Sequence, residues 1–166
     1  DSFQKYTGRV QASRKENDSW RLRGTPEPDG FLHLTCFTVP VGAVLEQARA
    51  RNVSLTAFMA AAMLMALQNL QRKKVRLRLR RKPLKVLIPV NLRKLFPSRT
   101  LRNFVLYTTP EIDPRLGEYS VAEICHIVHH HIGLDLDPKR MSTKIAVNVN
   151  SERMLAVKLL PLPSTR

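Results

Sequence analysis

Apolar residues recur at helical spacing in residues 41–51, with charged and polar residues between them. This pattern predicts a short amphipathic helix. Asn52 is expected to end it, and Ser54 is the expected N-cap of a second helix over residues 55–71. That second segment is apolar around nearly its full circumference, so we expect it to be buried on all sides.

A third helix is indicated after Ser120. The stretch Ser120-Val-Ala-Glu123 has the form of a capping box, in which the hydroxyl and the carboxylate each bind a backbone amide of the first turn. Its apolar stripe consists of Val121, Ile124, Val128 and Ile132. Gly133 is expected to end the helix as a C-cap.

Four stretches have the composition or the alternation of strands. Residues 31–39 are rich in aromatic and β-branched types, and residues 83–90 and 103–109 are similar. Residues 144–150 alternate polar and apolar side chains, as a strand with one covered face does. The predicted fold class is therefore α+β, with a mixed β-sheet packed by two or three helices.

The chain has 166 residues, of which 43% are hydrophobic and 25% charged, and these values are typical of a globular protein. Residues 1–30 are polar and interrupted by glycine and proline, so we expect an irregular leading segment with one edge strand near residues 20–23. Because the chain begins with Asp1 and no leader pattern follows, we interpret it as one domain cut from a longer protein.

The two cysteines, Cys36 and Cys125, form neither a metal-binding framework nor a disulfide scaffold. A reducing, cytoplasmic setting is predicted. The longest apolar stretch is shorter than the roughly 20 residues that span a bilayer. No membrane span is therefore expected.

The formal net charge is +15, and the densest positive charge lies in residues 72–82. Such a cluster is the electrostatic footprint of phosphate binding. However, arginine alternates with Val75, Leu77 and Leu79, which is also the pattern of a strand or ribbon with one solvated face. The run contains no aromatic residue for base stacking, so nucleic acid is the less favoured partner. A basic module that binds nucleic acid or another polyanion is kept as the alternative function.

Histidines cluster in the predicted third helix. His126 and His130 lie four residues apart on one face with Glu123, a spacing that could supply three zinc ligands. This face lies opposite much of the apolar stripe, where solvated side chains are expected. We therefore predict surface histidines and no metal site.

The stretch that runs from Ile88 to Phe104 reads IPVNLRKLFPSRTLRNF. It resembles the PVNLR-x-x-FPS-x-T-x-RNF segment of alcohol acetyltransferase-like proteins, which belong to the chloramphenicol acetyltransferase and condensation-domain superfamily. Upstream, Val53-Ser-Leu-Thr is similar to the start of that family's long apolar helix. Downstream, Asn148-Val-Asn-Ser-Glu152, followed by Leu-Leu-Pro-Leu, is similar to its later continuation.

The resemblance implies a two-lobed fold with a tunnel between the lobes, through which acyl-CoA and an alcohol acceptor meet. In that family the catalytic HHxxxDG motif lies on the first lobe, so residues 1–166 would be the second, C-terminal lobe alone. The chain would contribute no catalytic residue, and the later DFGWG-type motif of that family is missing from this sequence. The expected partners are the absent N-terminal lobe, acyl-CoA as co-substrate and the alcohol, with self-association through the uncovered face of the lobe.

One stretch nearly matches HHxxxDG itself, because His130 and His131 precede Asp135. The motif requires its histidine at the end of a strand and a glycine after the aspartate. Here the histidines fall in a predicted helix and Leu136 replaces the glycine. We interpret the match as coincidence.

The resemblance and the residues converge on the loop between the strands at 83–90 and 103–109. Its hydroxyl, amide and guanidinium groups could line a polar tunnel mouth for substrate and CoA. The predicted tunnel residues are Asn91, Arg93, Ser98, Thr100, Arg102 and Asn103. An equally weighted interpretation is that these side chains bind neighbouring backbone and only hold the shape of the loop. The basic run at 72–82 is placed near the CoA phosphates as a working hypothesis.

Overall fold

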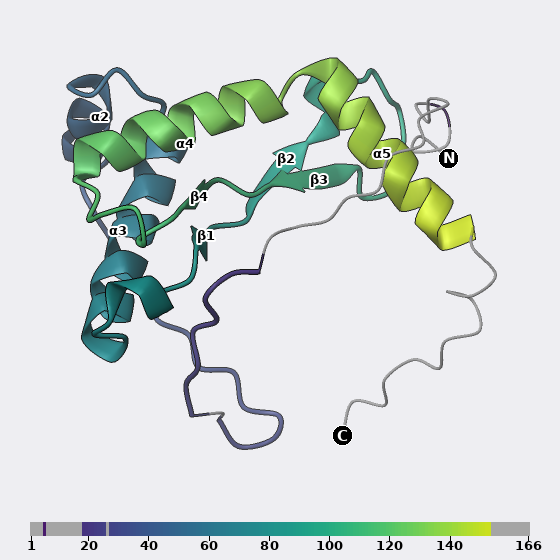
Figure 1. Cartoon of the computed structure of the whole chain (residues 1–166). Coiled ribbons are helices and arrows are strands. Elements are labelled where there is room, and N and C mark those ends of the chain that lie inside the picture. The colour runs from purple at the N-terminus through teal and green to yellow at the C-terminus, as the bar shows by residue number, and fades with distance from the viewer. Residues whose placement is uncertain (1–4, 6–17, 26, 154–166) are drawn as a thin grey trace. The chain divides into compact units, whose positions relative to one another are not determined.

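The computed structural model describes residue 5 and residues 18–25 and 27–153. This part of the chain is α+β, with four α-helices and two separate two-stranded antiparallel sheets (Figure 1). The helices are α2 (Val41–Arg49), α3 (Leu55–Lys74), α4 (Val121–Asp135) and α5 (Pro138–Arg153). The strands are β1 (Leu84–Lys85), β2 (Ile88–Asn91), β3 (Val105–Thr108) and β4 (Glu111–Ile112). The single mixed sheet that the sequence predicts is replaced by these two small sheets.

The chain divides into two compact units. We call residues 18–87 and 109–132 the helical unit, and residues 88–108 and 133–153 the hairpin unit. In the helical unit, α2 packs on α3, α3 on β1, and β1 on β4. Its buried apolar side chains include Ala57, Leu64, Leu84 and Ile124. The predicted N-cap of α3 is confirmed, because the Ser54 hydroxyl accepts a hydrogen bond from the Ala57 amide at 3.1 Å.

Helix α3 is buried on one face only, which corrects the expectation that it is covered all round. Ala57, Ala61 and Leu64 are fully buried. Large apolar side chains on the other face remain in solvent, and they are Leu55, Met59, Met63 and Leu70. The helix therefore carries a stripe of large apolar side chains that keep 38–56% of their surface exposed in the described structure.

The hairpin unit is built on β2 and β3, which pair antiparallel with Ile88 opposite Thr108 and Asn91 opposite Val105. Helix α5 contributes to the same hydrophobic cluster as the hairpin. The buried members of this cluster are Leu92, Phe96, Phe104, Leu106, Met141, Ile145 and Val149. Phe104 is the largest fully buried side chain among them.

Residues 144–150 lie within α5, so the strand predicted there is wrong. Asp137 caps the helix, since its carboxylate accepts hydrogen bonds from the Lys139 and Arg140 amides at 3.1 Å. Pro138 occupies the first helical position, where its missing amide hydrogen costs nothing. Met141, Ile145 and Val149 then share one buried face at four-residue spacing. The apolar residues at 145, 147 and 149 fit the two-residue repeat of a strand, but residues 141, 145 and 149 also fit the repeat of a helix. Burial of the second set stabilises the helix.

Residues 31–39 also form no strand. The segment is exposed throughout, and even Phe37 and Leu32 keep 86% and 78% of their surface in solvent. It pairs with no strand in the described structure. A strand needs a partner for its amides and carbonyls, and composition alone supplies none. The edge strand predicted near residues 20–23 is absent as well; Trp20 only donates its amide to the Pro83 carbonyl at 2.8 Å.

Other boundaries shift for local reasons. The strand predicted over residues 83–90 is divided into β1 and β2, which belong to different sheets. The strand predicted over 103–109 is confirmed as β3. The capping box of α4 is confirmed, with the Ser120 amide donating to the Glu123 carboxylate at 2.7 Å. Gly133 does not end α4, which continues to Asp135, because a helical glycine costs only about 1 kcal/mol.

Candidate functional site

The predicted tunnel residues all lie in the loop that joins β2 to β3 in the hairpin unit. Asn91 caps the short 3-10 helix Leu92–Lys94, and its side-chain oxygen accepts from the Arg93 amide at 3.1 Å. The Arg93 guanidinium donates to the Thr100 carbonyl at 3.0 Å and to the Arg102 carbonyl at 2.7 Å. Arg93 therefore ties the two sides of the loop together.

The hydroxyls of the loop bind backbone close by. The Thr100 amide donates to the Ser98 hydroxyl, and the Arg102 amide donates to the Thr100 hydroxyl, both at 3.2 Å. Asn91, Arg93, Ser98 and Thr100 thus hold the shape of the loop. By contrast, the side chains of Arg102 and Asn103 are exposed and make no hydrogen bond within the described residues.

The outcome divides the six predicted residues into two groups. Four act as internal supports, whereas Arg102 and Asn103 are exposed, together with Arg99 and Lys94. The loop is therefore a pre-formed, cationic surface at the end of a strand pair, suited to an anionic or polar ligand.

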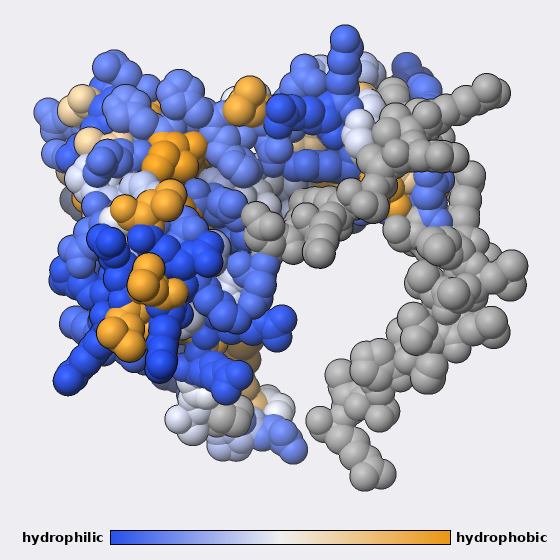
Figure 2. All heavy atoms as spheres, viewed as in Figure 1, coloured by the Kyte–Doolittle hydropathy of each residue, from blue (hydrophilic) through white to orange (hydrophobic). Residues whose placement is uncertain are grey.

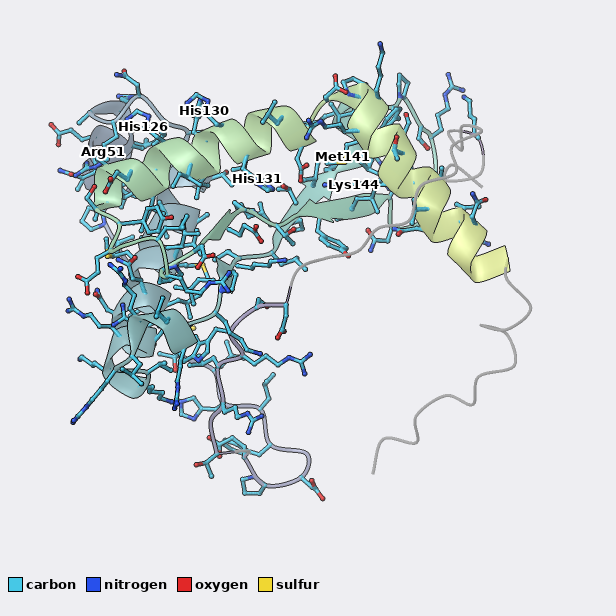
Figure 3. The ribbon with its side chains drawn as sticks, in the orientation of Figure 1. Arg51, His126, His130, His131, Met141 and Lys144 are labelled. Carbon is cyan, nitrogen blue, oxygen red and sulfur yellow. The ribbon has the colours of Figure 1, made fainter. Side chains whose placement is uncertain are left out.

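A polar cluster that the sequence analysis missed supports the hairpin unit. The Asp135 carboxylate accepts from the Thr108 hydroxyl at 2.6 Å and from the Lys144 ammonium at 2.5 Å. Each charged side chain keeps only 14% of its surface exposed. Figure 3 shows Lys144 projecting from α5. Asp135 ends α4 and Lys144 lies in α5, and nothing in the sequence predicts that these two side chains pair.

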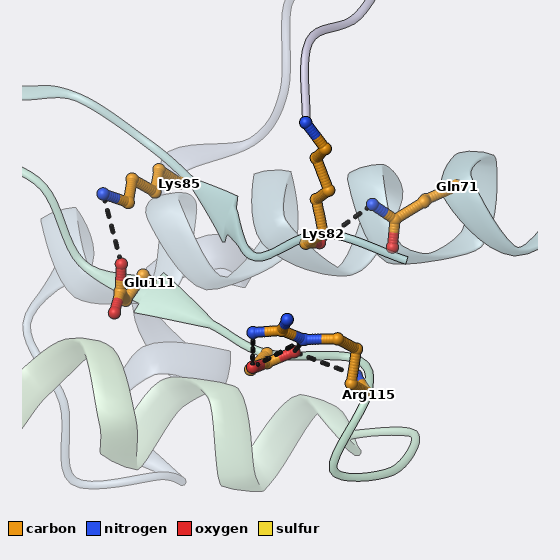
Figure 4. A network of polar contacts seen from close by, with 6 residues as sticks. Gln71, Lys82, Lys85, Glu111 and Arg115 are labelled. Atoms are coloured by element: carbon orange, nitrogen blue, oxygen red, sulfur yellow. Dashed lines mark hydrogen bonds and ion pairs between the residues drawn. The ribbon is translucent and has the colours of Figure 1, made fainter. Parts of the chain in front are cut away.

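The basic run at 72–82 belongs to the helical unit, and it is not the ribbon that alternation suggested. Residues 72–74 are the last turn of α3, and Arg78–Arg80 form a 3-10 helix. Arg81 is buried, and its guanidinium donates to the Val75 carbonyl at 3.2 Å. The side-chain amide of Gln71 donates to the Lys82 carbonyl at 2.9 Å (Figure 4). These two hydrogen bonds hold residues 81 and 82 against the C-terminal end of α3, so the cations of the basic run lie close to that helix end.

This surface is strongly hydrophilic with a few exposed leucines between the cations (Figure 2). Two hollows lie in it. One of about 340 Å³ is lined by Lys73, Lys74, Val75, Arg76, Leu77 and Arg80. The other, of about 640 Å³, is lined by Asp18, Ser19, Trp20, Arg21, Arg23, Lys74 and Lys82. We call the larger one the Trp20 pocket.

His126, His129 and His130 of α4 are exposed, as expected, whereas His131 is half-buried. His126 and His130 project from the same side of the helix, with ring centroids 6.5 Å apart (Figure 3). Both are exposed. Glu123 instead bonds to Ser120, which lowers the pKa of its carboxylate. Within the described residues, no group of three histidine, cysteine or acidic side chains could hold a metal ion.

His130 and His131 lie on a helix and not at a strand end, which agrees with our interpretation of the HHxxxDG near-match as coincidence. None of the described helices is long and apolar enough to cross a membrane. Comparisons of the chain with protein families, curated proteins and solved structures give no match.

Proposed function

We propose that the chain is the C-terminal lobe of an acyl-CoA-dependent alcohol O-acyltransferase, which supplies one wall of the substrate tunnel and leaves the catalytic histidine to another lobe. The observation that carries this proposal is the segment with the acetyltransferase-like sequence. It folds as one self-supported loop at the end of the β2–β3 pair, with Arg99, Arg102 and Asn103 facing solvent.

The uncovered apolar surface of the helical unit also supports the proposal. Met59 and Met63 on α3 and several large side chains of residues 31–41 are exposed. Monomeric proteins rarely leave so many large apolar side chains exposed, because each buried one would contribute about 1.5–3 kcal/mol. A lobe that lacks its mate would have this surface, and self-association through it is part of the proposal.

In such an enzyme a histidine of the other lobe would take the proton of the acceptor alcohol. The alkoxide would attack the thioester carbonyl, and the tetrahedral intermediate would collapse with loss of the CoA thiolate, which takes up the proton. Stabilisation of the intermediate's oxyanion needs donors that point at it. The role of this chain would be to bind and orient, through Arg102 and its neighbours, and not to transfer the proton.

The proposal is tested by producing this chain together with the lobe encoded upstream of it and measuring release of CoA thiol from acetyl-CoA with an alcohol acceptor. We expect turnover only with both lobes present. Arg102→Ala should lower kcat/KM, while Arg49→Ala, which removes an equal charge from an exposed position on α2 of the helical unit, is the matched control and should not. Unchanged folding and turnover in Arg102→Ala would contradict the assigned role of the loop.

A second candidate function is a basic module that binds a polyanion. It is favoured by the two cation-lined hollows of the helical unit, where the side chains of Lys74, Arg76 and Arg80 have no hydrogen-bond or ion-pair partner among the described residues. Binding to a phosphate-bearing resin that is released only at high salt, with no thiol release in the reconstituted assay, would favour this function over the transferase.

A further inference from the structure

The Trp20 pocket combines an aromatic ring with cations that are far apart in the sequence. Trp20 and the arginines after it lie more than 50 positions before Lys74 and Lys82. The backbone bond from the Trp20 amide to the Pro83 carbonyl, 2.8 Å long, fixes the leading segment beside the end of the basic run. The aromatic residue that the basic run lacks in sequence is therefore supplied by the fold.

The charges of the pocket leave a site for an anion. Four cations line it, against a single carboxylate. That carboxylate, on Asp18, is already bound to the Lys82 ammonium at 2.5 Å, and this contact lowers its pKa. Arg21 is attracted to Asp18 only at longer range, and Arg23 and Lys74 have no ion-pair partner among the residues that the structure describes, so these three cations remain available. Like charges that line one pocket repel one another, and a bound anion would relieve that repulsion.

Trp20 is half-buried and lines the pocket, so part of its surface remains accessible there. An indole face held in place is a stacking surface for a flat ring. The pocket volume of about 640 Å³ lies in the range of ligand sites, roughly 300–1,000 Å³. A ring on the indole with adjacent phosphates on the cations would use both kinds of group.

We propose that the Trp20 pocket binds a nucleotide that carries at least two adjacent phosphates, with its base on Trp20 and its phosphates on Arg21, Arg23 and Lys74. This inference requires only the pocket of the helical unit, and it holds whether or not the hairpin loop serves an acyltransferase. Coenzyme A carries the same ring and diphosphate as ADP, so the two compounds are separate arms of the test.

Trp20 is the only tryptophan of the chain, so its fluorescence reports on the pocket without a label. We expect ADP to change this fluorescence in a saturable way, with one site per chain. Adenosine and pyrophosphate should each bind at least tenfold more weakly, because each lacks one half of the interaction. Coenzyme A binding more tightly than ADP would identify the larger compound as the ligand, and equal affinity would show that the nucleotide part suffices; both results support the pocket.

Lys74→Gln and Arg23→Gln should each weaken ADP binding about tenfold, the loss expected for one charge-assisted hydrogen bond to phosphate. Both side chains are exposed and without described partners, so the variants should keep the circular dichroism of the wild type. The matched control is Arg78→Gln, which removes an equal charge from an exposed residue that lines neither hollow, and its affinity should stay within about twofold of the wild type.

The proposal would be overturned if the folded wild type showed no fluorescence change with ADP at millimolar concentration. It would also be overturned if Arg78→Gln weakened binding as much as Lys74→Gln, since this would indicate a diffuse field and not a pocket. Binding of a single-stranded oligonucleotide more tightly than ADP, with equal losses in all three variants, would replace the pocket by a nucleic-acid surface.

Discussion

Gln68 on α3 offers a quantitative test of how the helical unit is held together. Its side chain is 95% buried, and its amide pairs with the backbone of one residue, Tyr119, in both directions. The Gln68 nitrogen donates to the Tyr119 carbonyl at 2.9 Å, and the Tyr119 amide donates to the Gln68 oxygen at 3.0 Å. This pairing fixes the segment that leads into α4.

Gln68→Met keeps the length of the side chain and removes both bonds. Each lost bond leaves a half-buried backbone group without its partner, which costs about 1–2 kcal/mol, so we expect a loss of about 2–4 kcal/mol in the free energy of unfolding. Gln68→Glu should lose at least as much, because a carboxylate would oppose the Tyr119 carbonyl and carry charge into a buried position.

The assay is urea unfolding followed by the fluorescence of Trp20, which lies in the same unit as Gln68. With a slope of about 2 kcal/mol per M urea, the middle of the range for small proteins, the midpoint for Gln68→Met should fall by about 1–2 M. Asn69→Ala, one position along and exposed, is the control and should change the free energy by less than about 0.5 kcal/mol. A midpoint for Gln68→Met equal to that of this control would refute the reasoning.

Three further predictions concern other sites. Arg93→Ala removes both bonds across the loop at 91–103, so amide exchange there should become faster, whereas Lys94→Ala should leave it unchanged; equal rates in the two variants would contradict the role of Arg93. Exposed Cys36 should react with Ellman's reagent quickly and buried Cys125 slowly, since burial raises the pKa of the Cys125 thiol; two equally fast thiols would show that α4 is not packed as described. Hydrogen bonds from Ser120 lower the pKa of Glu123, so the stabilisation of α4 by this carboxylate is present above its unfolded pKa and is lost as the pH falls through its folded pKa. Glu123→Gln should therefore flatten the pH dependence of the helical circular dichroism signal. An unchanged pH dependence in this variant would refute the role of Glu123.

The sequence predicts best where local chemistry decides the structure. Ser54 and Ser120 both cap helices as expected, because a cap needs only residues within one turn. The strand at β3 and the loop before it are also found where the pattern places them.

The predictions of secondary structure and of side-chain contacts failed where these depend on residues far away in the sequence. Residues 31–39 have the composition of a strand but no strand beside them, and residues 144–150 alternate but bury a helical face. The pairing of Asp135 with Lys144 and the approach of Trp20 to Lys82 arise only from tertiary folding. Residue types and spacing predict which loop holds the candidate tunnel residues. Only the hydrogen bonds of the folded structure distinguish residues that hold the shape of the loop, such as Arg93, from exposed ones such as Arg102.

The proposal that the chain is one lobe of an acyltransferase is tested most directly by reading the coding DNA upstream of it. The account predicts a continuous reading frame that encodes a His-His-x-x-x-Asp-Gly motif within about 200 codons, the upper size of a typical domain. A stop codon in that interval, or a frame without the motif, would contradict the account.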